Sequence, residues 1–172
     1  MRIVIADDHG IVRSGIRLLL ERQPDLDVIA EAADGIEARD VVVRERPDLA
    51  ILDVKMPGLT GLQATREIKS QAPEVSILIL SMHDDERYLF EALKAGASGY
   101  VLKSQADIDL LSAIRSVERG EPFADRFDVD GGLGCFAHAP TPSRERVLGG
   151  PPPAAAPSLT QPTTSIATLL LS

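Results

Sequence analysis

The sequence predicts an α/β fold built on a doubly wound parallel sheet, and two features of residues 1–121 support this. Short aliphatic runs alternate with longer stretches in which apolar residues recur at helical spacing. Parallel strands are buried on both faces, so they appear as continuous apolar runs, and each needs a crossover to the next. Five such units predict five strands with helices on both faces, joined by right-handed crossovers.

The predicted strands and helices alternate along this part of the chain. The predicted strands are Arg2–Ala6, Asp27–Ala32, Leu49–Leu52, Ser76–Leu80 and Gly99–Leu102. The predicted helices are Ile11–Arg22, Gly35–Glu45, Gly61–Gln71, Glu86–Ala95 and Ala106–Arg119. In the first helix, one face is formed by Ile11, Gly15, Leu18 and Leu19, which is the spacing of an amphipathic helix.

Composition narrows the classes of protein that fit. A length of 172 residues suggests one domain with an additional segment, and 44% hydrophobic residues with only 3% aromatics predict an aliphatic core. The net charge of -8 argues against a broadly basic surface for nucleic acid. A single cysteine, Cys135, excludes an internal disulfide and argues against a zinc cluster. We expect a cytoplasmic protein, since we find no secretion signal or membrane-spanning run.

The composition changes after about residue 130. The remaining segment has only three charged residues, Arg144, Glu145 and Arg146, and is rich in proline and alanine. We expect residues 149–172 to form a disordered tail, because they can bury little apolar surface. Its last apolar run, Ile166–Leu171, is far too short to span a bilayer.

Three carboxylates are predicted to gather at one edge of the sheet. Asp7 and Asp8 close the first strand and Asp53 closes the third, and ligands bind beyond the carboxyl ends of such strands. Each has a simpler explanation, since acidic pairs often start helices and an isolated aspartate often caps a turn. Together, however, crowded like charges call for a cation, and hard oxygen ligands suit Mg²⁺.

Two further polar residues follow the fourth and fifth strands. Ser81 ends its strand and would ordinarily cap the next turn, whereas Lys103 is placed to reach an anion at the sheet edge. A divalent cation with a phosphate beside it would satisfy the three carboxylates, the hydroxyl and the ammonium. Tyr100 is either a functional side chain or a half-buried ring with a hydrated hydroxyl.

Residues 1–121 resemble the receiver domain of bacterial two-component response regulators. The resemblance is carried by Asp7-Asp8, by Asp53 with Met56-Pro57-Gly58 and Gly61 after it, by Ser81, by Gly96–Tyr100 and by Lys103. It implies a flavodoxin-like sheet with strand order 2-1-3-4-5. It also implies a phosphoacceptor signalling domain that assists its own phosphorylation and dephosphorylation, rather than an enzyme.

The resemblance implies a role for each site residue. Asp53 would accept a phosphoryl group from a sensor histidine kinase. The Mg²⁺ ion would be bound by Asp8, Asp53 and the backbone carbonyl of Lys55, and by Asp7 through water. Ser81 would hydrogen-bond the phosphoryl group, and Lys103 would pair with its oxygens.

The resemblance also implies a conformational switch. Ser81 would move towards the phosphoryl group, and Tyr100 would then rotate inward. This change would alter the surface formed by the fourth helix, fifth strand and fifth helix, and would control partner binding or homodimerisation. Phosphorylation would thereby shift the population of the domain from one packing to another.

Details of the sequence resemble the LuxR-type branch, whose members carry a helix-turn-helix output domain. These are Ser104 after the lysine, where many receivers have proline, and the opening Ile3–His9. His9 could be a ligand or simply a loop histidine. Residues 122–148 read as a linker and a remnant of the output domain's start, resembling its first helix at Thr141–Leu148. Because no recognition helix follows, we do not expect direct DNA binding; a truncated or frame-shifted gene and a genuine receiver with a tail both remain open.

Three other classes of protein share some of these features. A haloacid-dehalogenase-like phosphatase needs a second carboxylate two positions after its nucleophile, where this chain has Lys55. A flavodoxin-like cofactor binder needs a phosphate loop after the first strand, where Asp7 and Asp8 would repel a phosphate. A degenerate receiver that acts only as a phosphorylation-independent interaction module remains open.

Overall fold

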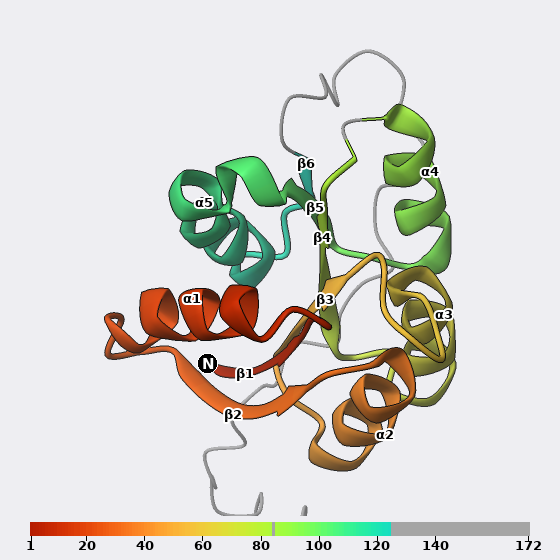
Figure 1. Ribbon diagram of the computed structural model, residues 1–172, viewed down its shortest axis with the longest axis horizontal. Coiled ribbons are helices and arrows are strands. Elements are labelled where there is room, and N and C mark those ends of the chain that lie inside the picture. Colours follow the sequence, from red (N-terminus) through yellow and green to blue (C-terminus); the bar gives the residue numbers. More distant parts are fainter. Residues whose placement is uncertain (84, 125–172) are drawn as a thin grey trace, which may run out of the picture. The chain divides into compact units, whose positions relative to one another are not determined.

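The elements of the structure, a computed structural model, alternate along the chain as the sequence predicts (Figure 1). The structure describes residues 1–83 and 85–124. The elements are β1 (Arg2–Ala6), α1 (Gly10–Glu21), β2 (Asp27–Ala32), α2 (Gly35–Glu45), β3 (Leu49–Asp53), α3 (Gly61–Gln71), β4 (Ser76–Ser81), α4 (Glu86–Ala95), β5 (Gly99–Leu102), the 3-10 turn η1 (Lys103–Gln105), α5 (Ala106–Glu118) and β6 (Phe123–Ala124). The predictions for Cys135, for the helix remnant at Thr141–Leu148 and for the tail at 149–172 lie outside the described residues.

The sheet is parallel throughout, with the order β2-β1-β3-β4-β5-β6. The order of the first five strands confirms the prediction. The sixth strand was not predicted: Phe123 and Ala124 pair with Gly99 and Tyr100 at the edge of the sheet. Two residues after a proline are too few to show any periodicity, so only the pairing with β5 reveals this strand.

Helices cover both faces of the sheet. Figure 1 shows α1 and α5 on one face and α2, α3 and α4 on the other. Each face has its own buried cluster, represented by Ile5, Leu20 and Ile114 on the first and by Leu52 and Ile68 on the second. All the largest fully buried side chains are aliphatic apart from Tyr100, which confirms the predicted aliphatic core.

The buried face of α1 differs from the one that the sequence pattern suggested. Ile16 and Leu20 are 5% and 0% exposed, whereas Ile11 and Leu18 are 90% and 62% exposed. Residues five apart differ by roughly 140° around a helix axis, so Ile11 and Ile16 cannot pack against the same surface. The helix has apolar residues on two faces, and periodicity alone did not show which of them packs against the sheet.

The loop between β3 and α3 is held in place by a close backbone contact at Gly61. A Cβ atom there would lie 2.1 Å from the carbonyl oxygen of Asp53. The same loop ends in a capping box, in which Thr60 and Gln63 satisfy each other's backbone N–H groups. The path of the chain after Asp53 is therefore fixed by Thr60, Gly61 and Gln63, which are not among the predicted site residues.

Gly61→Ala is expected to destabilise the fold by about 1–3 kcal/mol, because the added methyl group must displace the backbone of β3 or α3. The measurement is urea unfolding. Gly15→Ala is the control, because nothing lies within 4 Å of a Cβ atom at that position in α1. It should stabilise by up to about 1 kcal/mol through helix propensity. Equal effects of the two changes would show that the contact at Gly61 is unimportant.

Within the described part of the chain, every helix is too short or too polar to cross a bilayer.

Candidate functional site

The carboxyl ends of β1 and β3 bring three aspartates to the same edge of the sheet. Ala6 pairs with Leu52, so the residues that follow these two strands lie side by side. Asp7 is fully buried and Asp53 is 4% exposed, whereas the Asp8 side chain is 33% exposed. Two carboxylates are thus withdrawn from water and the third is accessible to it.

Lys103 forms ion pairs with both buried carboxylates. Its Nζ atom lies 2.6 Å from Asp7 Oδ2 and 2.8 Å from Asp53 Oδ2, and its side chain is only 9% exposed. The local sequence around Asp7 offers no cation, so the partner comes from the end of β5, across the neighbouring strands. Breaking a buried pair of this kind is costly, because it leaves charge without compensation.

Burial and the neighbouring charges shift the pKa values of Asp53 and Lys103. Burial raises the pKa of Asp53, and the charge on Asp7 acts in the same direction, although Lys103 and a backbone hydrogen bond from Lys55 oppose them. Burial works to lower the pKa of Lys103, but the two carboxylates outweigh it and hold that pKa above its ordinary value. The lysine therefore stays charged, and Asp53 is a carboxylate that folding makes harder to ionise.

The segment after β1 is held by hydrogen bonds and ion pairs that its side chains make. Asp7 Oδ1 accepts a 2.8 Å hydrogen bond from the His9 N–H, and the His9 Nδ1 atom lies 2.7 Å from Asp8 Oδ1. Arg13 donates to the Asp7 carbonyl at 2.6 Å and pairs with Glu31. The N-cap of α1 is His9 and its first turn contains no acidic residue. The acidic pair therefore does not serve as a helix start.

One loop residue, His83, connects the hydroxyls of Ser81 and Tyr100. Ser81 is buried at the end of β4, and its Oγ accepts a 2.9 Å hydrogen bond from the His83 N–H. The Tyr100 hydroxyl donates to the His83 carbonyl at 2.6 Å. The His83 ring stacks on Tyr88, with centroids 4.6 Å apart. Nothing in the sequence singled out His83, because both links use its backbone.

Tyr100 differs from the sequence-based expectation. Tyr100 is 0% exposed and its hydroxyl donates a hydrogen bond to a carbonyl group. The ring is therefore not half-buried with a hydrated hydroxyl. The ring also already points inward, which is the position predicted only for the phosphorylated state. An inward rotation therefore cannot start from the conformation described here.

The donor set fits a divalent cation. Asp7, Asp8, His9 and Asp53 each offer one ligand atom, and these atoms all lie within 4.8 Å of one another. Carboxylate oxygens are the ligands that Mg²⁺ prefers. Three carboxylates and the ammonium of Lys103 leave an excess of two negative charges when His9 is neutral, which a divalent ion would balance.

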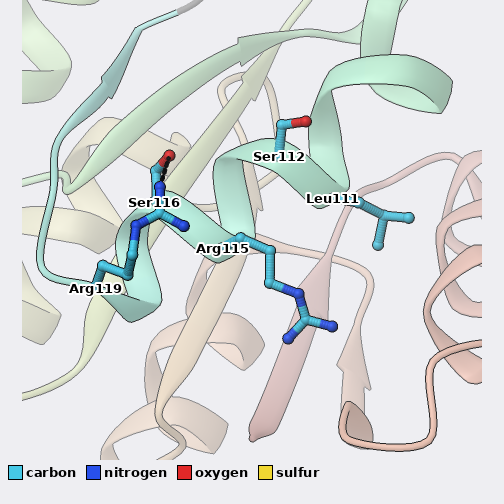
Figure 2. Close-up of a pocket in the computed structure, with 5 residues that line it drawn as sticks. All are labelled: Leu111, Ser112, Arg115, Ser116 and Arg119. Carbon is cyan, nitrogen blue, oxygen red and sulfur yellow. Dashed lines mark hydrogen bonds between the residues drawn. The ribbon is translucent and has the colours of Figure 1, made fainter.

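A separate pocket of about 350 Å³ is lined only by residues of α5 and its C-terminal end (Figure 2). Its two arginines already have anionic partners: Arg115 pairs with Asp25 and Glu118, and Arg119 pairs with Glu121. Figure 2 shows Arg119 beside Ser116, with Arg115 extending away from them. We do not assign this pocket a role in binding phosphate, because its positive charge is compensated.

The comparison with known proteins decides the family. Residues 3–115 match the response regulator receiver domain. The chain belongs to this family. Receiver domains are signalling domains rather than classical enzymes, and response regulators interact with sensor histidine kinases. They typically use Mg²⁺ at an acidic pocket such as the one formed by these aspartates.

The curated relatives of this receiver include an oxygen regulatory protein. The oxygen regulatory protein NreC of Staphylococcus epidermidis is 52% identical over 126 residues, which are 73% of this chain and 58% of that protein. The chain thus spans less than two thirds of the length of this relative.

Solved structures give the same result. A LuxR-family two-component response regulator from Aurantimonas sp. SI85-9A1 superposes with a TM-score of 0.68 at 42% identity, covering 71% of this chain and 87% of that one. The isolated receiver domain of RcsB from Salmonella enterica serovar Typhimurium, solved with the phosphomimetic BeF₃⁻, has a TM-score of 0.68 at 32% identity. That match covers 73% of this chain and 94% of the RcsB domain, and the flavodoxin-like fold expected from the sequence is confirmed.

Proposed function

We propose that this receiver accepts a phosphoryl group on Asp53 from a histidine kinase, with Mg²⁺, and so controls partner binding. The observation that carries the proposal is the pairing at the strand ends: the buried Asp53 carboxylate lies 2.8 Å from the ammonium of Lys103, whose side chain is 9% exposed, next to Asp7 and Asp8. A carboxylate nucleophile beside a fixed cation is the arrangement that phosphoryl transfer requires.

The proposed transfer is a displacement at phosphorus. An Asp53 Oδ atom forms the new P–O bond while the P–N bond of the kinase phosphohistidine breaks, and the electron pair of that bond stays on the imidazole. Lys103 would move from Asp53 towards the phosphoryl oxygens, where its charge offsets theirs. A bound Mg²⁺ ion supplies further neutralisation of that charge.

Four residues would hold the metal ion. We propose Asp8, Asp53 and the backbone carbonyl of Lys55 as direct ligands and Asp7 as a ligand through water. In support, the Asp8 carboxylate is partly exposed and can reach an ion directly. The Asp7 carboxylate is fully buried and its Oδ2 is occupied by Lys103, which suits an indirect role.

The link through His83 suggests how phosphorylation changes the surface. Ser81 Oγ would turn towards the phosphoryl group and release the His83 N–H, to which it is bonded in this conformation. The loop that holds the Tyr100 hydroxyl is then free to move, together with the surface of α4, β5 and α5. We propose this loop shift in place of an inward rotation of Tyr100.

We propose two kinds of partner for the switch. The kinase would contact the α1 side, where Ile11 and Leu18 are exposed apolar residues available for docking. A second copy of the chain, or another regulator, would bind the surface formed by α4, β5 and α5 once the domain is phosphorylated. Because the sequence resembles the LuxR-type branch, whose members carry a helix-turn-helix output domain, we propose that the whole protein regulates transcription.

The test is intact mass after incubation with acetyl phosphate. We expect a gain of one phosphoryl group in the presence of Mg²⁺ and none in EDTA, because the transfer needs the cation. A histidine kinase should serve as an alternative donor. If neither donor labels the chain and Mg²⁺ does not bind, the domain is a degenerate receiver used only for protein contacts.

A further inference from the structure

We propose that His9 supplies a nitrogen ligand to the metal site, so that the pocket selects first-row transition-metal ions over Mg²⁺. The inference deepens the proposed function, because it rests on a cation binding among the three aspartates. Nothing in the proposed phosphoryl transfer requires a histidine at this position.

The geometry places the imidazole inside the donor cluster. His9 Nδ1 lies 2.7 Å from Asp8 Oδ1 and 3.3 Å from Asp7 Oδ1. It is also within 4.8 Å of the donor atom of Asp53. Nδ1 can bind a cation placed between these groups when the neutral ring carries its proton on Nε2, so no net proton need be lost from the ring.

The rest of the His9 residue leaves the ring available. Its side chain is 67% exposed, and although His9 is the N-cap of α1 its side chain makes no capping hydrogen bond. Its backbone N–H is fixed by Asp7 Oδ1 at 2.8 Å. The ring can therefore turn towards an ion by a side-chain rotation alone, with the backbone held in place.

The other groups at the site determine where a cation can sit. Lys103 occupies the buried side, at Oδ2 of both Asp7 and Asp53. The Oδ1 atoms that His9 Nδ1 approaches are those of Asp7 and Asp8. A cation repelled by the ammonium would thus be displaced towards the side of the pocket that the imidazole faces.

The chemistry of the ligand set then sets the selectivity. Mg²⁺ prefers oxygen and gains little from an imidazole, whereas Mn²⁺, Co²⁺, Ni²⁺ and Zn²⁺ accept mixed nitrogen and oxygen ligands, with an affinity that rises from Mn²⁺ through Co²⁺ to Ni²⁺. A mixed set of the Asp8 and Asp53 carboxylates, the Lys55 carbonyl and the His9 imidazole should therefore bind Co²⁺ much more tightly than Mg²⁺. It would make the occupancy of the phosphorylation site sensitive to transition metals.

The test is calorimetric titration of the full chain with Co²⁺ and with Mg²⁺, in the wild type, His9→Ala and His83→Ala. We expect His9→Ala to weaken Co²⁺ binding by at least the roughly tenfold that loss of a supporting partner costs at metal sites. Mg²⁺ binding should change much less. His83→Ala is the matched control, since His83 lies in another loop and is absent from the donor cluster, and it should match the wild type for both ions.

A spectroscopic measurement tests the ligand itself. Pulsed electron paramagnetic resonance of bound Mn²⁺ should show coupling to a nitrogen nucleus in the wild type and in His83→Ala, and none in His9→Ala. If Mg²⁺ and Co²⁺ bind but His9→Ala changes both equally, or if the nitrogen coupling persists, the inference about His9 is wrong and the aspartate site stands. If the wild type binds neither ion, the proposed metal-dependent function fails as well.

Discussion

Asp53→Asn is expected to lose all phosphorylation by acetyl phosphate and to be more stable than the wild type at neutral pH. The first effect follows because the amide oxygen is not a nucleophile towards phosphorus. The second follows because the repulsion between two buried carboxylates is removed. Lys103 would then pair with a single buried carboxylate, that of Asp7. We expect a rise in Tm of a few degrees, which corresponds to about 1 kcal/mol in a domain of this size.

The stability gain of Asp53→Asn should depend on pH. The folded-state pKa of Asp53 is raised by burial, so the folded protein holds this proton more tightly than the unfolded chain does. The wild type is therefore most stable, as far as this group is concerned, below the ordinary carboxyl pKa, and it loses that contribution as the pH rises through the raised value. The two proteins should converge on acidification and diverge towards neutral pH.

Asp40→Asn provides the control for both effects. Its side chain is 58% exposed and pairs with Arg39 at the surface of α2, so the change should leave phosphorylation intact and alter stability only slightly. If Asp53→Asn still gained one phosphoryl group, another residue would be the acceptor. If it were less stable than the wild type at neutral pH, the charge crowding described here would not limit stability.

Lys103→Met is expected to destabilise the fold by about 3–5 kcal/mol at neutral pH, because it leaves the buried carboxylates of Asp7 and Asp53 without their cation. Methionine preserves most of the length of the side chain, so packing changes little. Without the ammonium the pKa of Asp53 rises further, because Lys103 is the main group that lowers it. Stability should therefore return as the pH falls, since protonation of Asp53 removes the repulsion. Urea unfolding at neutral and at acidic pH is the measurement.

Two comparisons make the Lys103 result specific. Lys94→Met removes an exposed lysine that pairs with Glu91 at 3.2 Å on the surface, and it should cost less than about 1 kcal/mol. The double variant with Asp53→Asn should recover part of the loss, since only one buried carboxylate then lacks a partner. Equal losses in Lys94→Met and Lys103→Met, or no recovery in the double variant, would contradict the proposed coupling.

The sequence predicts those features of the fold that depend on the pattern of apolar and polar residues within a short segment. The five longer strands, the helices between them and the order of those strands followed from aliphatic runs and crossover rules. The convergence of Asp7, Asp8, Asp53 and Lys103 also followed, because the carboxyl ends of parallel strands share one edge. The roles proposed for these residues are still predictions.

The features that escaped prediction depend on contacts between distant segments. β6 is visible only through its pairing with β5, and the packing face of α1 depends on how that helix sits against the sheet. The pairing of Lys103 with two carboxylates is a choice between possible partners that spacing does not fix. The position of Tyr100 depends on a carbonyl group in a loop after β4.

The two hydrogen bonds of His83 have a consequence for how such a switch can evolve. The Ser81 and Tyr100 hydroxyls are both hydrogen-bonded to main-chain atoms of this residue. Substitution of its side chain would therefore leave both hydrogen bonds in place. Proline is the exception, because it lacks the N–H that Ser81 accepts. A signalling connection made in this way tolerates substitution at its central residue and leaves little trace in the identity of that residue.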